Sequence, residues 1–388
     1  MGKTKVAMVL YTSGLEYDDR IRKEMLSISK HCPDVEFEVF AVTPKNIEEE
    51  GVTGYGVKYH LPYLKSRDKY ASKTHVLAKA WDFYKTVKPK LKSFDVIWCA
   101  DIETFLFPLL LKTKKALIWD LHELPTRFMN SGVMKRVFRY MEKRCNVIYH
   151  ANGSRIDRLR ELGMVTGKTP HIAIRNYPNA NLSSTNVKPI AIAEKFYDWL
   201  ADRKCIYLQG LVASDRRPFE TVSAVMDTSD YCGVVVGGFP DEIKTRLIEK
   251  YGENNLKNRI FFAGKVPQLQ TRNFIEKCRM GIVLYVMDCL NNIYCEPNRM
   301  FQTIMMGKPV IVGANPPMKE LVEKYNVGKA LNDDGGSIDD IRSAIEIIDY
   351  NYESLSNNTI VASAEISWES QEELLVNTFK QAINIDRK

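Results

Sequence analysis

Short apolar segments with strand character alternate with segments of helical periodicity, and this pattern runs twice along the chain. Because parallel strands need crossover connections, which are usually helices, the order predicts an α/β fold with a doubly wound parallel sheet in each half. The expected strands are Val6–Leu10, Glu36–Val42, Asp95–Cys99, Ala116–Trp119, Val147–His150 and His171–Ile174, then Cys205–Gln209, Gly233–Val236, Ile260–Phe262, Gly281–Tyr285 and Pro309–Val312. The helices expected in the second half are Phe219–Met226, Asp241–Tyr251, Pro267–Lys277, Pro297–Met306 and Met318–Tyr325.

A segment without periodicity separates the two halves. Residues 176–189 are rich in Asn, Pro and Ser, and a strand-led alternation starts again at Cys205. We therefore expect two tandem Rossmann-like domains, at residues 1–180 and 190–366. Residues 367–388 follow them and carry one more amphipathic helix.

Composition places the chain among ordinary globular proteins, with 45% hydrophobic and 27% charged residues. The longest apolar run, Phe105–Leu111, is too short to span a membrane, and Val6–Leu10 is too short for a signal-peptide core. A cytoplasmic protein is the expectation. The eight cysteines form no C-x-x-C pair and the six histidines show no ligand spacing, so neither a metal nor another cofactor is expected.

Positive charge is concentrated in the first half. Residues 1–185 contain 31 Lys and Arg against 20 Asp and Glu, although the net charge of the whole chain is only +7. A basic half can bind nucleic acid, an anionic membrane surface or a phosphorylated substrate. For any single cluster of basic residues, the alternative is a helix face exposed to solvent. Nothing resembles a helix-turn-helix or an aromatic–basic stripe, so no nucleic-acid partner is expected.

Common nucleotide and hydrolase motifs are missing from the sequence. The first strand is followed by a single glycine, Gly14, and not by G-x-G-x-x-G, which argues against a dinucleotide dehydrogenase. Gly163–Thr169 is one residue short of a P-loop and precedes a strand, so it is interpreted as coincidence. There is no G-x-S-x-G nucleophile motif.

Other segments suit the binding of a phosphate at strand ends. Gly14 and Gly210 each follow a strand, and Arg216 and Arg217 precede the next helix of the second half. Backbone N–H groups, helix N-termini and arginines bind phosphate at such positions. A turn with solvated arginines is the alternative interpretation.

A polar helix start in the second half is the most informative stretch. It begins at Pro297 and ends at Gly307, and a well-capped surface helix is the alternative interpretation. Its crowded polar groups are Glu296, Asn298, Arg299 and Gln302.

At Pro297–Ile311 the sequence resembles glycosyltransferase family 4, whose members have the GT-B fold, two Rossmann-like domains facing across a cleft. The pattern P-N-[KR]-x-F-[EQ]-x(4)-G-x-P-V-I fits there. Further matching segments occur in the same order along nearly the whole chain. They are Asp19–Glu24, Asp101, Asp120–Glu123, Arg175–Pro178, Gly237–Gly238, Phe262–Pro267 and the tail helix from Trp368.

The resemblance implies transfer of a hexose from a nucleoside-diphosphate sugar, with retention at the anomeric carbon and without a metal. The second domain would bind the donor. The first would bind a saccharide or a polyprenyl-diphosphate-linked acceptor, with the C-terminal helix packed back on it. A role in cell-surface polysaccharide biosynthesis, at the cytoplasmic face of the plasma membrane, would follow.

The resemblance also assigns roles to individual residues. His122 and Arg216 would be the catalytic residues, with His122 near the transferred sugar and Arg216 on the donor diphosphate. Gly264 and Val266 would meet the base. The other donor-binding positions would be Gly14, Gly210, Glu296, Asn298, Arg299 and Gln302.

The sequence departs from the family at one place. A Glu-x(7)-Glu pair common in the family reads Tyr294 and Gln302 here, and Glu296 is the nearest acid. A neutral amide binds a ribose hydroxyl more weakly than a carboxylate does. A sugar-nucleotide 2-epimerase and a non-catalytic nucleotide-sugar-binding subunit of a glycan-assembly complex therefore remain alternatives.

Overall fold

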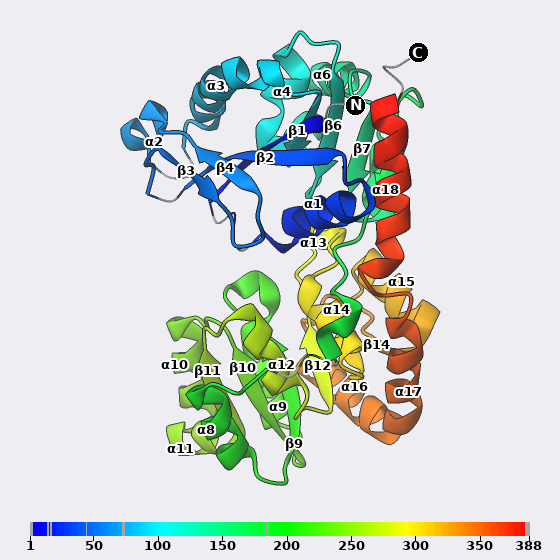
Figure 1. Cartoon of the computed structure of the whole chain (residues 1–388). Coiled ribbons are helices and arrows are strands. Elements are labelled where there is room, and N and C mark those ends of the chain that lie inside the picture. Colours follow the sequence, from blue (N-terminus) through cyan, green and yellow to red (C-terminus); the bar gives the residue numbers. More distant parts are fainter. Residues whose placement is uncertain are drawn as a thin grey trace. The chain divides into compact units, whose positions relative to one another are not determined.

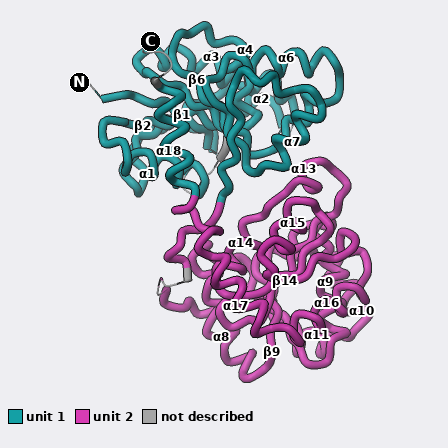
Figure 2. Tube along the Cα trace, turned by 90° about the vertical axis from the view of Figure 1, so that its right-hand side faces the viewer, with its two compact units in different colours: residues 1–176, 371–388 teal, residues 177–370 magenta. Residues whose placement is uncertain are grey.

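The computed structural model describes residues 3–13, 15, 18–43, 45–71, 74–183, 185 and 187–384. The chain divides into two compact units (Figure 2). The first comprises residues 1–176 and 371–388, and the second comprises residues 177–370. In the described residues each unit contains one sheet, and helices lie on its faces (Figure 1). This confirms the predicted fold class of two α/β domains with parallel sheets.

The first unit has an eight-stranded sheet in the order β3-β4-β2-β1-β5-β6-β7-β8, as far as the structure describes it. All neighbouring strands are parallel except β3 and β4. The strands are β1 (Thr4–Ser13), β2 (Val35–Val42), β3 (Glu49–Val52), β4 (Lys58–Leu61), β5 (Val96–Ala100), β6 (Ala116–Leu121), β7 (Val147–His150) and β8 (His171–Ala173). The central strands β5, β6 and β7 are buried along their whole length, as continuous apolar runs are in parallel sheets.

The helices of the first unit begin at well-defined caps. Asp18, Ser131 and Asn152 each accept a hydrogen bond from a backbone N–H in the first turn of the helix that follows. The helices are α1 (Asp19–His31), α2 (Lys65–Lys69), α3 (Val76–Val87), α4 (Leu106–Leu110), α5 (Thr126–Met129), α6 (Gly132–Glu142) and α7 (Gly153–Glu161), with 3-10 turns η2 (Lys88–Ser93) and η3 (Ile102–Thr104).

The C-terminal helix α18 (Glu369–Asn384) lies beside β7 and α1 (Figure 1). Tyr149 on β7 and Thr378 share a hydrogen bond of 3.0 Å between their hydroxyl oxygens. Glu372 accepts hydrogen bonds from Ser27 and Lys30 on α1, at 2.9 and 3.0 Å. From Gln371 onward the C-terminal helix is therefore part of the first unit.

The second unit has a parallel six-stranded sheet in the order β11-β10-β9-β12-β13-β14, within the described ranges. The strands are β9 (Lys204–Gln209), β10 (Tyr231–Val236), β11 (Ile260–Gly264), β12 (Met280–Val283), β13 (Val310–Val312) and β14 (Gly328–Ala330). The helices are α8 (Ala191–Leu200), α9 (Pro218–Met226), α10 (Asp241–Tyr251), α11 (Glu253–Arg259), α12 (Thr271–Ile275), α13 (Leu290–Ile293), α14 (Asn298–Met305), α15 (Pro316–Tyr325), α16 (Ile338–Tyr350) and α17 (Tyr352–Ser363), with 3-10 turns η4 (Ala180–Ser183), η5 (Ser214–Arg216) and η6 (Gln268–Gln270).

Some elements differ from those expected. The helix expected at Pro267–Lys277 is shorter, because η6 takes its first turn and only Thr271–Ile275 is α-helical. The additional elements include the strands β3, β4 and β14 and the helices α16 and α17. No helix in the described part of the chain is long and apolar enough to cross a membrane.

Candidate functional site

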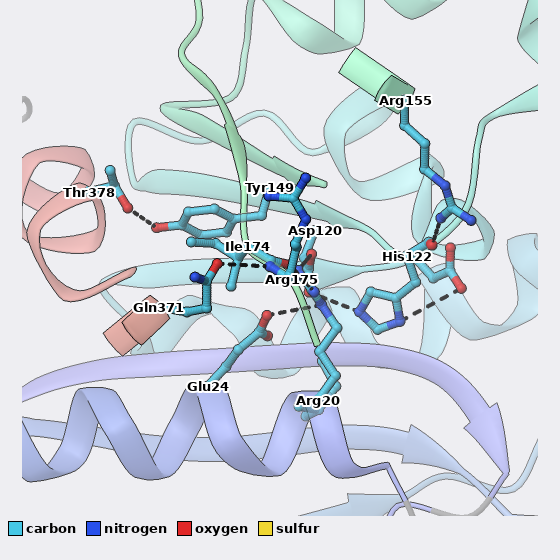
Figure 3. A network of polar contacts seen from close by, with 12 residues as sticks. Arg20, Glu24, Asp120, His122, Tyr149, Arg155, Ile174, Arg175, Gln371 and Thr378 are labelled. Carbon is cyan, nitrogen blue, oxygen red and sulfur yellow. Dashed lines mark hydrogen bonds and ion pairs between the residues drawn. The ribbon is translucent and has the colours of Figure 1, made fainter. Parts of the chain in front are cut away.

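In the first unit, a buried ion pair joins the first helix to the end of a central strand (Figure 3). Arg20 on α1 donates from Nη2 to Oδ1 of Asp120, at 2.7 Å, and from Nε to Oδ2, at 3.1 Å. Asp120 belongs to β6 and is completely buried. Two parallel charge-assisted hydrogen bonds fix the carboxylate's position and orientation.

Glu24, one turn after Arg20, completes the buried cluster. Its Oε1 lies 3.1 Å from Nε of Arg20. Burial, followed by the charge of Asp120, raises the pKa of Glu24 well above its usual range. Burial would also raise the pKa of Asp120, but Arg20 and then His122 outweigh it and lower that pKa. Arg20 and His122 therefore favour the ionised form of Asp120, whereas burial and the charge of Asp120 favour the neutral form of Glu24.

His122 follows β6 and lies between two aspartates. Its Nε2 is 2.8 Å from Oδ2 of Asp120 and its Nδ1 is 3.9 Å from Oδ2 of Asp101. Arg155 donates a hydrogen bond to the carbonyl oxygen of His122 (Figure 3). Burial alone would lower the pKa of His122, but Asp120 and then Asp101 raise it to about 9. At neutral pH the ring is an imidazolium that donates hydrogen bonds and cannot act as a base.

Asp101 holds an unusual backbone conformation for a residue with a side chain. Its φ is +62°, in the region that favours glycine. Three hydrogen bonds hold it there: its N–H donates to the Asp120 carbonyl at 2.6 Å, and its own carbonyl accepts from Trp119 Nε1 at 3.1 Å and Thr104 Oγ1 at 2.7 Å. Strained residues that neighbours fix in this way are concentrated at functional sites.

A polar cavity of about 300 Å³ opens beside His122. Its wall includes Asp18, Asp101, Glu103, His122 and Glu123. Burial and then Asp101 raise the pKa values of Glu103 and of Glu123. Carboxyl groups beside an imidazolium accept and donate hydrogen bonds, so the cavity suits a ligand rich in hydroxyl groups.

In the second unit, three neighbouring strands end without a side chain. Gly210 follows β9, Gly237 follows β10 and Gly264 ends β11, with φ values of +69°, +107° and +69°. The N–H of Gly210 donates to Val236 at 3.1 Å, and that of Gly237 donates to Gly264 at 2.7 Å. An added Cβ at Gly264 would meet nothing within 4 Å, so a ligand can approach the backbone there, at the carboxyl end of a strand, where open α/β sheets bind ligands.

Two arginines lie over one tyrosine ring next to these strand ends. The Cζ of Arg216 is 3.8 Å from the ring centre of Tyr285, and the Cζ of Arg299 is 4.8 Å from it. Arg299 comes from α14, is 8% exposed, and donates to the carbonyls of Gln209 and Leu284. Its Nε is buried and has no hydrogen-bond partner among the described residues.

The charge of Arg299 is not balanced within the second unit. Burial lowers its pKa, Tyr285 opposes this, and Arg216 lowers the pKa further. Among the described residues, no ion pair joins Arg299 to a carboxylate. A buried cation without a counter-ion is costly, and an anion with several oxygens, such as a diphosphate, would offset that cost.

Arg217, the neighbour of Arg216, has a different environment. It forms ion pairs with Asp334, at 2.5 Å, and with Glu220, at 3.6 Å. It also precedes α9 with a φ of +51°. Arg217 therefore connects the start of α9 to the loop after β14, whereas Arg216 lies on Tyr285 and pairs with its neighbour Asp215, at 3.3 Å.

The remaining predicted residues lie at the start of α14, after β11 or outside the described residues. Asn298 is the first residue of α14, and Gln302 lies one turn later, is 7% exposed, and makes no side-chain hydrogen bond within the described part of the chain. Glu296 lies two residues before α14 and Val266 two residues after β11. Gly14 lies outside the described residues. His122 belongs to the first unit, and Arg216 belongs to the second.

The sequence alone does not identify two parts of these clusters. Tyr285 ends an apolar segment and lies two residues after β12, and its only signal is its place beyond the carboxyl end of a strand. The pairing of Arg20 with Asp120 spans 100 residues. Its only local signal is that Arg20 and Glu24 flank the apolar stripe of α1.

Two parallel α/β sheets in tandem define the fold as GT-B. No protein-family model matches the chain, and no curated protein matches it. Among solved structures, it is similar to sucrose-phosphate synthase from Thermosynechococcus elongatus, with a TM-score of 0.75 and 14% identity over 98% of this chain and 99% of that one. It is also similar to HepE from Anabaena in complex with UDP, with a TM-score of 0.71 and 12% identity over 97% and 100% of the two chains. A UDP-forming trehalose-phosphate synthase from Burkholderia xenovorans gives a TM-score of 0.67 and 11% identity over 97% and 99%.

Proposed function

We propose that this protein is a glycosyltransferase that moves a hexose from a nucleoside-diphosphate sugar to a saccharide or lipid-linked acceptor, with retention at the anomeric carbon. The observation that carries the proposal is the pair Arg216 and Arg299. Both lie over Tyr285 beside strand ends that carry no side chain, and Arg299 is buried without a carboxylate partner among the described residues. This arrangement suits a diphosphate held by the two arginines.

The chemistry of the donor supports this role for the arginines. When the bond between the sugar and the diphosphate breaks, negative charge develops on the β-phosphate oxygen. Fixed positive charges that point at that oxygen stabilise the transition state more than the ground state. Arg216 and Arg299 would supply this stabilisation, and we expect no metal to be required.

The donor is proposed to be a UDP-sugar. Three of the similar structures contain UDP or UDP-glucose, and another belongs to a UDP-forming enzyme. In this proposal Gly264 and Val266 meet the base, and the amide oxygen of Gln302 accepts a hydrogen bond from a ribose hydroxyl. Asn298 binds the donor sugar or its phosphates. Glu296 lies close enough in sequence to α14 to contribute a carboxylate to the same site.

His122 is proposed to act on the sugar side of the reaction. Its pKa of about 9 makes it a hydrogen-bond donor at neutral pH, and its Nδ1 lies toward Asp101 on the wall of the polar cavity. An imidazolium there can hold a hydroxyl oxygen of the transferred sugar. The proposed setting is cell-surface polysaccharide biosynthesis at the cytoplasmic face of the plasma membrane, where the basic first unit would meet a lipid-linked acceptor.

A panel of nucleotides tests the proposal. Ligand present at 100 times its Kd stabilises a folded protein by about 2.7 kcal/mol, so UDP and the correct UDP-sugar should raise Tm by several degrees. With membrane extract as the source of acceptor, UDP should then be released. The variant Arg299→Ala should lose the Tm shift, and the matched control Arg342→Ala, which removes a surface arginine of α16, should keep it.

Each of the other outcomes would indicate a different function. Epimerised donor without an acceptor would indicate a sugar-nucleotide 2-epimerase. Nucleotide binding without any turnover would indicate a non-catalytic subunit, which Tyr294 and Gln302 in place of the Glu pair would explain. A protein whose Tm no nucleotide changes would contradict the whole proposal.

A further inference from the structure

The first unit has an apolar cavity next to the polar one. Its volume is about 160 Å³, and it lies among α3, η3, α4, α5 and α6. Its apolar wall includes Leu77, Phe105, Leu109, Phe128, Met134 and Val137. Apolar cavities of about this size bind molecules as large as benzene.

The apolar cavity opens to solvent. Leu77 contributes to its wall and is 69% exposed. An open cavity with an apolar wall can take up the apolar part of a ligand, as ligand pockets do. A short alkyl or isoprenoid group is the kind of ligand that fits.

One residue belongs to both cavities. Glu103 lines the polar cavity together with His122 and lines the apolar cavity together with Phe105. Glu103 is in the 3-10 turn η3, which begins directly after the strained backbone of Asp101. A ligand that passes Glu103 would place a polar part beside His122 and an apolar part beside Phe105.

The charges around this junction favour an uncharged polar part. Asp18, Asp101, Glu103 and Glu123 contribute carboxyl groups to the polar cavity, and its described wall contains neither Lys nor Arg. Its cation is His122, whose charge Asp120 and Asp101 already balance. Arg127, on the wall of the apolar cavity, partly offsets the charge of Glu103. Carboxylates accept hydrogen bonds from sugar hydroxyls and repel phosphate.

We propose that the two cavities of the first unit bind one amphiphilic acceptor, an uncharged sugar joined without phosphate to an apolar group. That the bound molecule is an acceptor rests on the proposed function, but its binding does not. The sugar occupies the polar cavity beside His122, and the apolar group occupies the cavity between Leu77 and Val137. A polyprenyl-diphosphate carrier does not fit this charge pattern.

Calorimetric titration of the full chain with alkyl glycosides tests the proposal. The probes are octyl glycosides of glucose, galactose and mannose, each below its micelle-forming concentration, and the matching methyl glycosides. Burial of two or more methylene groups should make the best octyl glycoside bind about tenfold more tightly than its methyl counterpart. Octyl phosphate should bind at least about tenfold more weakly than that octyl glycoside, because carboxylates surround the junction.

Two variants locate the site. Val137→Phe fills the apolar cavity and should reduce the affinity for the octyl glycoside to that for the methyl glycoside. Val133→Phe, four residues earlier on α6 at a position 65% exposed, is the matched control and should leave it unchanged. If Val137→Phe does not fold, Leu77→Trp at the exposed rim replaces it.

UDP binding to the same preparations separates the two proposals. If the protein binds UDP but binds octyl and methyl glycosides with equal affinity, the amphiphilic acceptor is contradicted and the proposed function is retained. If octyl phosphate binds as tightly as the octyl glycoside, the proposal that the polar part of the ligand is uncharged is contradicted. Equal loss of octyl glycoside affinity in Val137→Phe and Val133→Phe would overturn the assigned cavity. If the protein binds the octyl glycoside but not UDP, the amphiphilic ligand is supported and the proposed function is contradicted.

Discussion

A Cβ atom at position 210 would lie 2.7 Å from Nη1 of Arg299. Gly210 has a φ of +69°, and the guanidinium group occupies the space that a side chain would need. Gly210→Ala should therefore displace Arg299 and weaken UDP binding about tenfold or more, with a loss of about 1–3 kcal/mol in the free energy of unfolding. Calorimetric titration with UDP and thermal unfolding measure the two effects.

Gly252→Ala is the matched control for backbone strain. Its φ is +79° and an added Cβ would meet nothing within 4 Å, so only the strain term applies. It should lower Tm and leave UDP affinity unchanged. Equal UDP affinity in both variants would show that Gly210 has no role in placing Arg299.

Arg216 and Arg217 should respond differently to substitution. Arg216→Ala removes a charge that lies on Tyr285, and should cost about 2–4 kcal/mol of transition-state stabilisation, as for one well-placed electrostatic donor. Arg217→Ala breaks the ion pairs with Asp334 and Glu220. It should lower Tm, and its effect on kcat/KM should be smaller than that of Arg216→Ala. Kinetics with the donor identified by the nucleotide panel check both values. Unchanged turnover and binding in Arg216→Ala would remove it from the donor site.

Variants of Gln302 test the donor site at the position where a Glu is common in glycosyltransferase family 4. Its amide makes no hydrogen bond within the described ranges, and it lies one turn after Arg299 on α14. Gln302→Ala should weaken UDP binding by about 1 kcal/mol, the scale of one hydrogen bond, without unfolding the protein. Gln302→Glu should keep or improve binding, because a carboxylate is the stronger acceptor for ribose hydroxyls. A Glu variant unable to bind any nucleotide would show that the site is built differently.

The fold was predictable largely because its central strands are buried on both faces. Runs such as Val96–Ala100 are apolar throughout and appear in the sequence as continuous segments. Two strands at one side of the first sheet escaped prediction for the opposite reason. Glu49–Val52 and Lys58–Leu61 are partly exposed and polar, so neither an apolar run nor a clear alternation marks them.

The site was predictable only residue by residue. Gly210 and Arg299 were each identified from local pattern, because a glycine after a strand and an arginine at a helix start are local features. Their contact depends on β9 pairing with β12, which brings together segments 90 residues apart. The cavity beside Leu77 and Val137 has no sequence signal, since the same residues could equally fill a core.

The pH dependence of stability should report the charge on His122. Its pKa is raised from 6.5 to about 9 in the folded state, so its stabilising contribution is complete below pH 6.5 and is lost as the pH rises through about 9. Over this window the free energy of unfolding should fall with a slope approaching about 1.4 kcal/mol per pH unit. Urea unfolding at a series of pH values measures it. His122→Gln should flatten the slope, and a variant with the slope of the parent would contradict the assignment.

The basic face of the first unit gives the last test. The exposed side of α3 carries Leu77 and Trp81 and continues to Lys85 and Lys88. On α6, Val133 and Tyr140 are exposed on either side of Arg136. Apolar and cationic side chains on neighbouring helices suit the interface of an anionic membrane, where each Lys or Arg contributes about 1 kcal/mol.

We therefore expect the protein to sediment with anionic vesicles at low salt and to be released at high salt, because the attraction is screened beyond a Debye length. Lys85→Glu combined with Lys88→Glu should abolish this sedimentation. The control Lys195→Glu combined with Lys257→Glu changes the net charge equally but at exposed lysines of the second unit, and should retain it. A protein that stays in the supernatant with anionic vesicles at low salt does not dock on membranes through charge. Its basic face would then serve solubility, and acceptors free in solution would be the ones to assay first.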